Sequence, residues 1–489
     1  MVRAKLTGMA LATALLVGGL TAGSAAASPT MTCSGSTKAL TGSLPDGATY
    51  RIQCPSGTWN GTLFLYSHGY VVPGSSNPAE DVGDPITGQW LLDNGFALAG
   101  SSYSTTGWAI QSALSDQVST LNVFDQTYGK PQTTIAWGHS LGGIITAGLI
   151  QDYPSLFQAA LPMCGVLSGG VATWNTALDG AFAFQQLIDP SIQIVHISNP
   201  TANLEAGEAA TVAAQQTPAG VARLALVAAL DDTPGWFTPL SSEPAANDYA
   251  AQEQNQYLWD TQVTFPFVLA FRSDLEAKVG GNPSWNTGVN YVADLAKSAD
   301  LKEVVALYKA AGLSLTKDLQ TLNNAPRISA DPSAVAYLAK YISFNGEISV
   351  PVLSMHTTGD GLVVPENEQA YRSVVDRDGN GNLLRQIFVN RAGHCAFTPA
   401  ETITAVKTLL NRLSTGHWNV PSPAGLNSEA ETLGTTDNVY IQTTTNSNGS
   451  STTTLVPTAP AFTTYFPRPY LRPFDLAPFF GGGPDRLVP

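Results

Sequence analysis

Residues 133–151 read TTIAWGHSLGGIITAGLIQ, and this stretch decides how the rest of the chain is interpreted. Its first five residues are β-branched, apolar or aromatic, which predicts a buried strand, and the residues after Gly142 predict a helix. Between them, residues 138–142 match the pattern G-x-S-x-G around Ser140. A sharp strand-to-helix turn strains the backbone of its central serine, and small neighbours relieve the crowding. The stretch therefore predicts Ser140 as a nucleophile, with a packed structural turn as the alternative.

Other short apolar or β-branched segments alternate with helical segments, which is the pattern of a mostly parallel sheet flanked by helices. Besides 133–137, strands are predicted at residues 62–67, 96–99, 159–163, 351–355 and 383–389. A helix is expected from about residue 108 to 124, and a closing helix from about 399 to 413. The fold class predicted from this order is α/β.

Between the two groups of strands the sequence becomes helical. Ala-rich amphipathic segments at 206–216, 218–230 and 295–311 indicate helices inserted into the α/β core. The predicted domains are a signal peptide at 1–27, a first core part at 28–165, a helical cap at 166–345, a second core part at 346–415 and a Thr/Pro-rich extension at 416–489. In that extension, 439–445 and 452–456 predict a hairpin around the turn at 446–449. The Pro-rich end from residue 466 is expected either to drape over the core or to be disordered.

The N-terminus predicts export. Arg3 and Lys5 precede an apolar run from Met9 to Leu20, and residues 25–27 offer an A-x-A cleavage site. The run is shorter than the roughly 20 residues that span a bilayer. We therefore expect cleavage before Ser28 and release of a chain without a stable membrane anchor into the extracellular space.

Composition excludes several classes of protein. The chain has 489 residues, of which 44% are hydrophobic and 12% charged, so an intrinsically disordered chain is not expected. Its formal net charge of −14 argues against nucleic acid as a partner, because phosphate binding needs a basic face. It argues equally against a polybasic membrane-surface protein. The oligomeric state is left open.

Four cysteines remain after the predicted cleavage: Cys33, Cys54, Cys164 and Cys395. An even number in an exported chain favours disulfides, and four cysteines allow three pairings. Cys33 and Cys54 are close in sequence, so closing that local loop costs the least entropy and leaves Cys164 for Cys395. Buried free thiols remain the alternative. A metal site is not expected, because the chain has no C-x-x-C motif or clustered Cys/His spacing.

The remaining parts of a nucleophilic site follow other predicted strands. The strand at 62–67 ends at His68-Gly69-Tyr70, and the N–H groups of Tyr70 and Leu141 are the predicted oxyanion donors. Of the six histidines, His394 is the one in a short polar loop just beyond a predicted strand, and Asp360 follows the strand before it. Serine, acid and histidine then occur in the chain order expected of such a site.

These motifs together resemble the α/β-hydrolase superfamily, in particular its secreted bacterial esterase-like and lipase-like members. The resemblance rests on Gly-His-Ser-Leu-Gly-Gly at 138–143, His-Gly-Tyr at 68–70, Gly-Asp-x-x-Val-Val-Pro at 359–365 and Gly-His-Cys at 393–395. It covers about 50–165 and 346–415 and implies Ser140 as nucleophile, Asp360 as acid and His394 as base, without a cofactor. The inserted helices would form a cap over the site.

A narrower likeness is to tannase and feruloyl-esterase relatives. In these a cysteine follows the catalytic histidine and pairs with one that precedes the serine. Cys395 fits this pattern, whereas position 139 is His. Cys164, beyond the next strand, is the candidate partner that would instead fix the histidine loop.

The leading functional hypothesis is hydrolysis of a small-molecule or polymeric carboxylic ester with an apolar or aromatic group. It draws on aromatic residues of the predicted cap, which are equally consistent with an ordinary cap core: Phe182, Phe184, Trp236, Phe237, Phe265 and Phe267. A serine peptidase on the same fold is the first alternative, although no acidic cluster that would anchor a peptide terminus is evident in the cap. A polyester depolymerase and a non-catalytic exported binding protein are the others.

One further motif resembles half of a calcium-binding loop. Residues 376–381 read DRDGNG, but the twelfth position is Ile387 rather than a bidentate glutamate. A solvated turn before the strand at 383–389 is the preferred interpretation, so no metal is predicted here either.

Overall fold

A nine-stranded sheet forms the centre of the computed structural model, which describes residues 31–35, 38–445 and 451–474. The strand order is β1-β2-β4-β3-β5-β6-β7-β8-β11. The strands are β1 (Leu40–Ser43), β2 (Thr49–Gln53), β3 (Thr62–Ser67), β4 (Ala97–Ser101), β5 (Thr133–His139), β6 (Ala159–Met163), β7 (Val352–Gly359), β8 (Leu384–Ala392) and β11 (Phe462–Thr463). From β4 to β8 neighbouring strands are parallel, while β1, β2 and β11 pair antiparallel at the two edges. This is the α/β-hydrolase fold that the sequence predicts.

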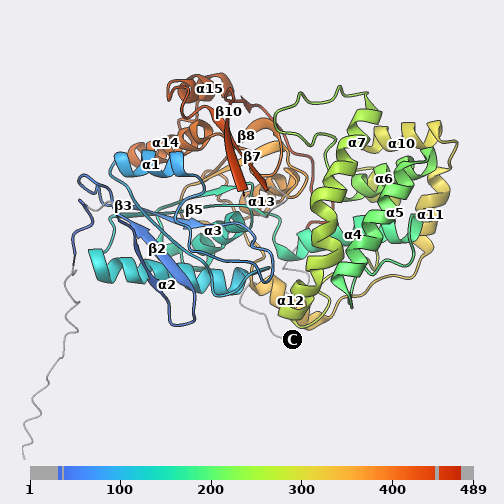
Figure 1. Cartoon of the computed structure of the whole chain (residues 1–489), viewed down its shortest axis with the longest axis horizontal. Coiled ribbons are helices and arrows are strands. Elements are labelled where there is room, and N and C mark those ends of the chain that lie inside the picture. Colours follow the sequence, from blue (N-terminus) through green and yellow to red (C-terminus); the bar gives the residue numbers. More distant parts are fainter. Residues whose placement is uncertain (1–30, 36–37, 446–450, 475–489) are drawn as a thin grey trace, which may run out of the picture.

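Helices cover both faces of the sheet. Helices α2 (Ile110–Tyr128), α3 (Leu141–Asp152) and α13 (Glu366–Arg377) pack on one face, and α1 (Pro85–Asp93), α14 (Pro399–Thr415) and α15 (Pro423–Glu431) on the other. Figure 1 shows α1 and α14 on the opposite side of the sheet from α2. Side chains of β3 alternate between the two cores, Leu63 and Leu65 toward α2 and α3, Phe64 and Tyr66 toward α1 and α14.

The chain between β6 and β7 is helical and stands beside the sheet as a second layer of structure (Figure 1). It comprises α4 (Gly170–Leu187), α5 (Pro200–Gln215), α6 (Pro218–Asp231), α7 (Tyr249–Trp259), α8 (Arg272–Val279), α9 (Tyr291–Leu295), α10 (Leu301–Ala310), α11 (Leu315–Asn324) and α12 (Pro332–Lys340), with π-helical segments at Asp260–Thr264 and Pro266–Phe271. Its own apolar cluster includes three of the aromatic residues singled out above: Phe182, Phe184 and Phe265. These three are therefore core residues of the helical layer.

Two local predictions are wrong. The single helix expected at 295–311 is interrupted, because the Ser298 hydroxyl accepts the Asp300 N–H at 3.2 Å and this local bond replaces a helical one. Strands β1 and β2 are missing from the prediction. The turn between them, Pro45-Asp46-Gly47, is a strong hairpin signal that identifies them in retrospect.

The C-terminal extension is largely ordered against the rest of the molecule. Strands β9 (Val439–Thr445) and β10 (Ser451–Pro457) form the predicted antiparallel pair, and the turn expected between them lies outside the described residues. Beyond β11, Tyr470 and Leu471 are buried and the Arg472 guanidinium binds Asp179 of α4. The tail thus drapes over the core and the helical layer as far as Phe474, the last residue that the structure describes.

Both predicted disulfides are present. Cys33 bonds to Cys54 beside β2, and Cys164 bonds to Cys395 across the sheet end. The predicted signal peptide at 1–27 lies outside the described residues. In the described part of the chain, no helix combines the length and apolarity that crossing a bilayer requires.

Candidate active site

Ser140 sits on a strained turn between β5 and α3. Its backbone has φ 58° and ψ −123°, in the left-handed region that side chains rarely adopt. A Cβ at Gly142 would lie 1.8 Å from the Ser67 carbonyl oxygen, and one at Gly138 would lie 2.4 Å from the same atom. The close approach of β3 therefore requires glycine at both positions, as the G-x-S-x-G motif predicts.

Backbone strain is concentrated around this turn. Of the six described non-glycine residues with positive φ, four surround the end of the central strands: Tyr103, Ser140, Cys164 and Cys395. Strained conformations persist only where the surrounding structure holds them, and they gather at functional sites. The backbone alone thus marks this end of the sheet as the candidate site.

The loop after β3 approaches Ser140 closely. A Cβ at Gly69 would lie 3.4 Å from the Ser140 Cβ, and the loop is held by His68, whose Nδ1 and Nε2 lie 2.8 Å and 3.1 Å from the Gly69 and Ser102 carbonyl oxygens. Tyr70 and Leu141 line one cavity with Ser140. Leu141 is the first residue of α3, so its N–H has no acceptor within the helix. Both predicted oxyanion donors are brought to the serine.

Asp360 and His394 are joined by a short hydrogen bond. The Asp360 Oδ2 accepts from His394 Nδ1 at 2.7 Å, and Oδ1 accepts the backbone N–H groups of Leu362 and Val363 at 3.0 Å each. Burial would raise the pKa of Asp360, but the charges and hydrogen bonds of His394 and His356 outweigh it and lower this pKa to about 2. The Asp360 carboxylate is therefore ionised at neutral pH.

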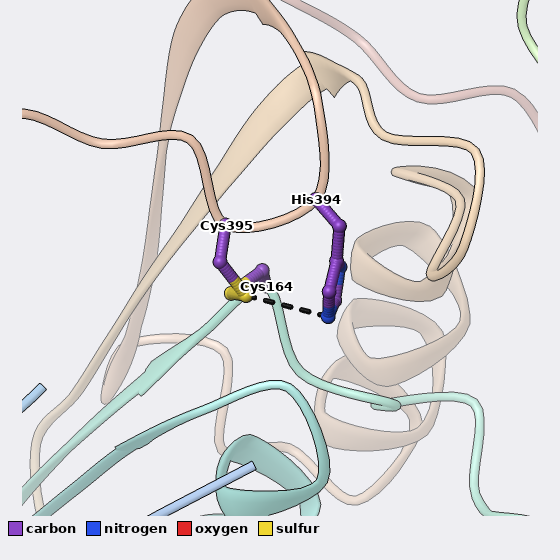
Figure 2. Close-up of side chains that lie close together, drawn as sticks. All are labelled: Cys164, His394 and Cys395. Atoms are coloured by element: carbon purple, nitrogen blue, oxygen red, sulfur yellow. Dashed lines mark hydrogen bonds between the residues drawn. A yellow bond between two sulfur atoms is a disulfide. The ribbon is translucent and has the colours of Figure 1, made fainter. Parts of the chain in front are cut away.

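The Cys164–Cys395 disulfide ties the histidine loop to the turn that carries Ser140. The Ser140 N–H donates to the carbonyl oxygen of Met163, the residue before Cys164, and Cys395 directly follows His394. Figure 2 shows the imidazole beside the sulfur atoms, with Nε2 3.4 Å from the Cys395 Sγ. Among the described residues, the Ser140 hydroxyl makes no hydrogen bond to His394.

The same three side chains are gathered closely enough to resemble a metal site. The ligand atoms of Cys164, His394 and Cys395 lie within 4.8 Å of one another. Both sulfur atoms are consumed in the disulfide, however, and a metal-binding cysteine is a thiolate. The cluster is a covalent brace beside an imidazole and does not offer the ligands of a zinc or iron site.

A second buried histidine, absent from the predicted site, supports Asp360. His356 on β7 has its Nδ1 3.1 Å from Glu368 Oε1 and its Nε2 2.7 Å from the Val363 carbonyl oxygen. Because both ring nitrogens face acceptors, both donate and the ring is an imidazolium. Burial lowers the pKa of His356, but the carboxylates of Asp360, 3.6 Å from Nε2, and of Glu368 outweigh it and raise this pKa to about 10. The i, i+4 spacing of His356 and Asp360 at a strand end is the signal that reveals this pair.

Replacing His356 with glutamine is expected to make the free energy of unfolding fall less steeply as the pH rises above neutral. Since folding raises the pKa of His356 from 6.5 to about 10, the stabilisation is complete below about pH 6.5 and is lost as the pH rises toward 10. The wild-type free energy of unfolding should fall more steeply than that of the variant, by up to about 1.4 kcal/mol per pH unit. Urea denaturation between pH 6 and 10 measures both slopes, with His417→Gln on the surface as control. Parallel slopes would contradict a charged His356.

His139, next to the serine, is a different case. It is buried, and burial together with the charge of His394 lowers the pKa of His139 to about 4, so the ring is neutral. Its Nδ1 lies 3.2 Å from the Tyr66 hydroxyl on β3. It therefore packs the turn against the sheet. Residues 376–381, the half calcium loop, run from the last two residues of α13 into the turn before β8, where the Asn380 amide donates to Asp378 at 2.6 Å.

The cavity beside Ser140 has a volume of about 90 Å³. Its wall is mostly apolar and aromatic, and among the residues of the helical layer that line it are Trp174, Asp231, Thr264, Phe267 and Val268. Phe267 is thus the one aromatic of those predicted for the cap that lies in this wall. Trp174 and Asp231 are missing from the sequence prediction, since helical periodicity does not distinguish a cavity wall from a core face.

The chain is similar to several known proteins. The chain is 29% identical over 432 residues to an o-phthalyl amidase from Xanthobacter agilis, which covers 81% of this chain and 91% of that protein. Among solved structures, feruloyl esterase B from Aspergillus oryzae has a TM-score of 0.38 at 10% identity, covering 87% of this chain and 86% of the esterase. The acylaminoacyl peptidase of Pyrococcus horikoshii has a TM-score of 0.32 at 10% identity, covering 73% of this chain but only 37% of the peptidase.

The disulfide beside the histidine differs from the tannase pattern in one partner. His139 stands where that pattern has a cysteine, and Cys164 supplies the sulfur from the end of the next strand instead. The profile of a protein family matches residues 42–385, well over half of the chain. The chain belongs to this family, which is described as a tannase-like family of unknown function (DUF6351).

Proposed function

We propose that this protein is a serine hydrolase of carboxylic esters, with Ser140 as nucleophile, His394 as general base and Asp360 as the acid that orients it. The proposal rests chiefly on one observation: the strained serine turn and the Asp360–His394 hydrogen bond meet at the same sheet end, linked by a disulfide. A nucleophile, a base and an orienting group are what covalent acyl transfer requires.

In the proposed reaction the Ser140 oxygen attacks the ester carbonyl and His394 Nε2 takes the hydroxyl proton. The Tyr70 and Leu141 N–H groups would bind the oxyanion, and the imidazolium would return the proton to the leaving alcohol. Water then repeats the sequence on the acyl-enzyme. For the first step the ring must exchange its contact with the Cys395 sulfur for one with the serine, since catalytic hydrogen bonds commonly tighten only when substrate binds.

Amide hydrolysis is the second candidate, because the relative from Xanthobacter agilis is named an amidase. The proposed residues serve either reaction, since both pass through a tetrahedral intermediate and an acyl-enzyme. An ester has the better leaving group, so ester turnover is expected to be the faster of the two. We propose that the helical layer, residues 166–345, forms a cap that would cover either substrate.

We also propose export. Support comes from the two disulfides, which form and persist in oxidising compartments, and from the signal-peptide pattern at residues 1–27. Mass spectrometry of the secreted chain after expression in a bacterial host tests this, with Ser28 expected as the new N-terminus.

A series of p-nitrophenyl esters tests the proposed substrate class. A cavity of about 90 Å³ admits a short chain or a single ring, so kcat/KM should be highest for short acyl groups. It should fall by about tenfold or more by eight carbons. Matched p-nitroanilides of the same acyl groups measure the amide reaction. Turnover of anilides alone would favour the amidase, and a maximum at long chains would contradict the small acyl site.

A further inference from the structure

One carboxylate lines the cavity beside Ser140. Asp231 is the last residue of α6, and among the described residues that form the cavity wall it is the only charged one. Its side chain keeps part of its surface open to the cavity although the residue lies deep in the molecule. No described residue donates a hydrogen bond to it. An ionised carboxylate that is removed from water is costly without a partner, so a group that enters the cavity and pairs with Asp231 would be stabilised.

The neighbouring carboxylate shows what is missing at Asp231. Asp179 of α4 is also buried, but it accepts the Tyr291 hydroxyl at 3.0 Å and pairs with the Arg472 guanidinium from the C-terminal tail. Asp231 has neither kind of partner. Burial, followed by the negative charge of Asp179, raises the pKa of Asp231 to about 7. Ionisation of Asp231 is therefore less favourable than that of a solvent-exposed aspartate.

A second carboxyl group lies close to this end of the cavity. Asp260, in the π-helical segment, is buried within electrostatic range of Asp231, and one of its carboxylate oxygens has no hydrogen-bond partner among the described residues. The described residues of the wall include no lysine, arginine or histidine. A positively charged group entering the cavity would thus give Asp231 the partner that these residues do not supply.

We infer that the group which fills this cavity carries a positively charged nitrogen, an ammonium or a similar hydrogen-bond donor, and that Asp231 binds it. The inference rests on the proposed function, because it assigns the substrate class of that same site. Asp231 is a specificity-determining residue: it binds the substrate away from the reacting carbonyl.

Other ligand chemistries fit these contacts less well. A carboxylate in the cavity would be repelled by Asp231 and would find no cation in the wall. A neutral hydroxyl would satisfy one oxygen but would leave the negative charge uncompensated. A divalent cation needs several oxygen ligands, and Asp231 is the one carboxylate that the wall provides.

Four para-substituted esters test the inference: p-nitrophenyl benzoates with a 4-aminomethyl, 4-hydroxymethyl, 4-methyl or 4-carboxy substituent. For the wild-type protein, kcat/KM of the aminomethyl ester should exceed that of the methyl ester by about 10- to 100-fold, the range of a hydrogen bond to a charged group. In Asp231→Asn this preference should fall to within about threefold. Thermal melts of Asp231→Asn and of the wild type, compared side by side, show whether the variant folds.

Asp232→Asn is the matched control. It makes the same change of side chain one residue further along, at a left-handed position (φ 54°) that asparagine tolerates, and Asp232 lines a different pocket. This variant should keep the preference for the aminomethyl ester. Equal rates for the aminomethyl and methyl esters in the wild type, or a preference that survives in Asp231→Asn, would overturn the inference. So would equal rates for the aminomethyl and hydroxymethyl esters.

Separate measurements test Ser140 as the nucleophile and Asp231 as the group that binds the substrate's positive charge. If Ser140→Ala hydrolyses the methyl ester as fast as the wild type, the proposed nucleophile is wrong whatever the substituent effect. If Ser140→Ala is inactive, calorimetry of that variant with 4-(aminomethyl)benzamide measures the anchor alone. Binding that weakens by about tenfold or more when Asp231 is also replaced supports the anchor, and unchanged binding overturns it.

Discussion

Replacing Ser140 with alanine is expected to lower kcat for p-nitrophenyl acetate by at least about 10⁴-fold, because the variant has no atom that can form the acyl-enzyme. The residual rate would come from oxyanion donors and substrate binding alone. Stability should change little, since both residues carry a Cβ at the strained φ of 58°. Steady-state kinetics and thermal melts of the purified mature chain measure the two effects.

Ser115→Ala is a suitable control, because Ser115 is an exposed serine on α2 whose hydroxyl donates to the Ser112 carbonyl oxygen of the same helix. It should retain the wild-type kcat. A Ser140→Ala variant that keeps more than about one tenth of the activity would contradict the proposed nucleophile, provided that its melting temperature is unchanged. A loss of activity together with a loss of folding would be resolved by Ser140→Cys, which keeps the shape and restores a nucleophile.

Removing the Cys164–Cys395 disulfide by alanine substitution of both residues is expected to lower kcat by about 10²-fold. The disulfide holds the loop that carries His394, and a misplacement of the base by about 1 Å is enough for a loss of this size. It also joins segments 231 residues apart, so its removal should reduce the free energy of unfolding by about 2–5 kcal/mol. Activity should be measured well below the melting temperature of the variant, so that unfolding does not contribute.

The other disulfide separates the two effects. Cys33→Ala with Cys54→Ala opens a loop of 21 residues near β2, which should cost about 3 kcal/mol of stability. Because this bond lies far from His394 in the chain and braces only the sheet edge, kcat should be retained. If both double variants lose stability and neither loses activity, the Cys164–Cys395 bond is a structural staple and does not position the base.

Much of the fold can be predicted from local sequence patterns. Strand β5 and helix α3 are predictable because the G-x-S-x-G turn imposes its geometry within five residues, whatever lies elsewhere in the chain. Asp360 and His394 are predictable as neighbours because each comes just after a strand of a parallel sheet, and such strand ends meet at one edge. Strand β7 continues past the predicted end at Met355 to Gly359, so Asp360 follows it without a gap.

The rest depends on contacts between segments that are distant in sequence. Asp231 ends an ordinary amphipathic helix, and only the packing of α6 against α4 and the core places it in a cavity wall. His356 lies within a buried strand, and its charge depends on Glu368, one helix further along. A sequence pattern records periodicity and spacing, whereas the charge and exposure of these two side chains are set by tertiary packing.

The most direct test of the central claim is a covalent label. The mature chain should react with an alkyl fluorophosphonate to gain the mass of a single phosphonyl group, and peptide mapping should place it on Ser140. Prior incubation with p-nitrophenyl acetate should slow the labelling, and Ser140→Ala should not be labelled. Labelling of a different residue, or no labelling of a protein that hydrolyses the ester, would contradict Ser140 as the nucleophile.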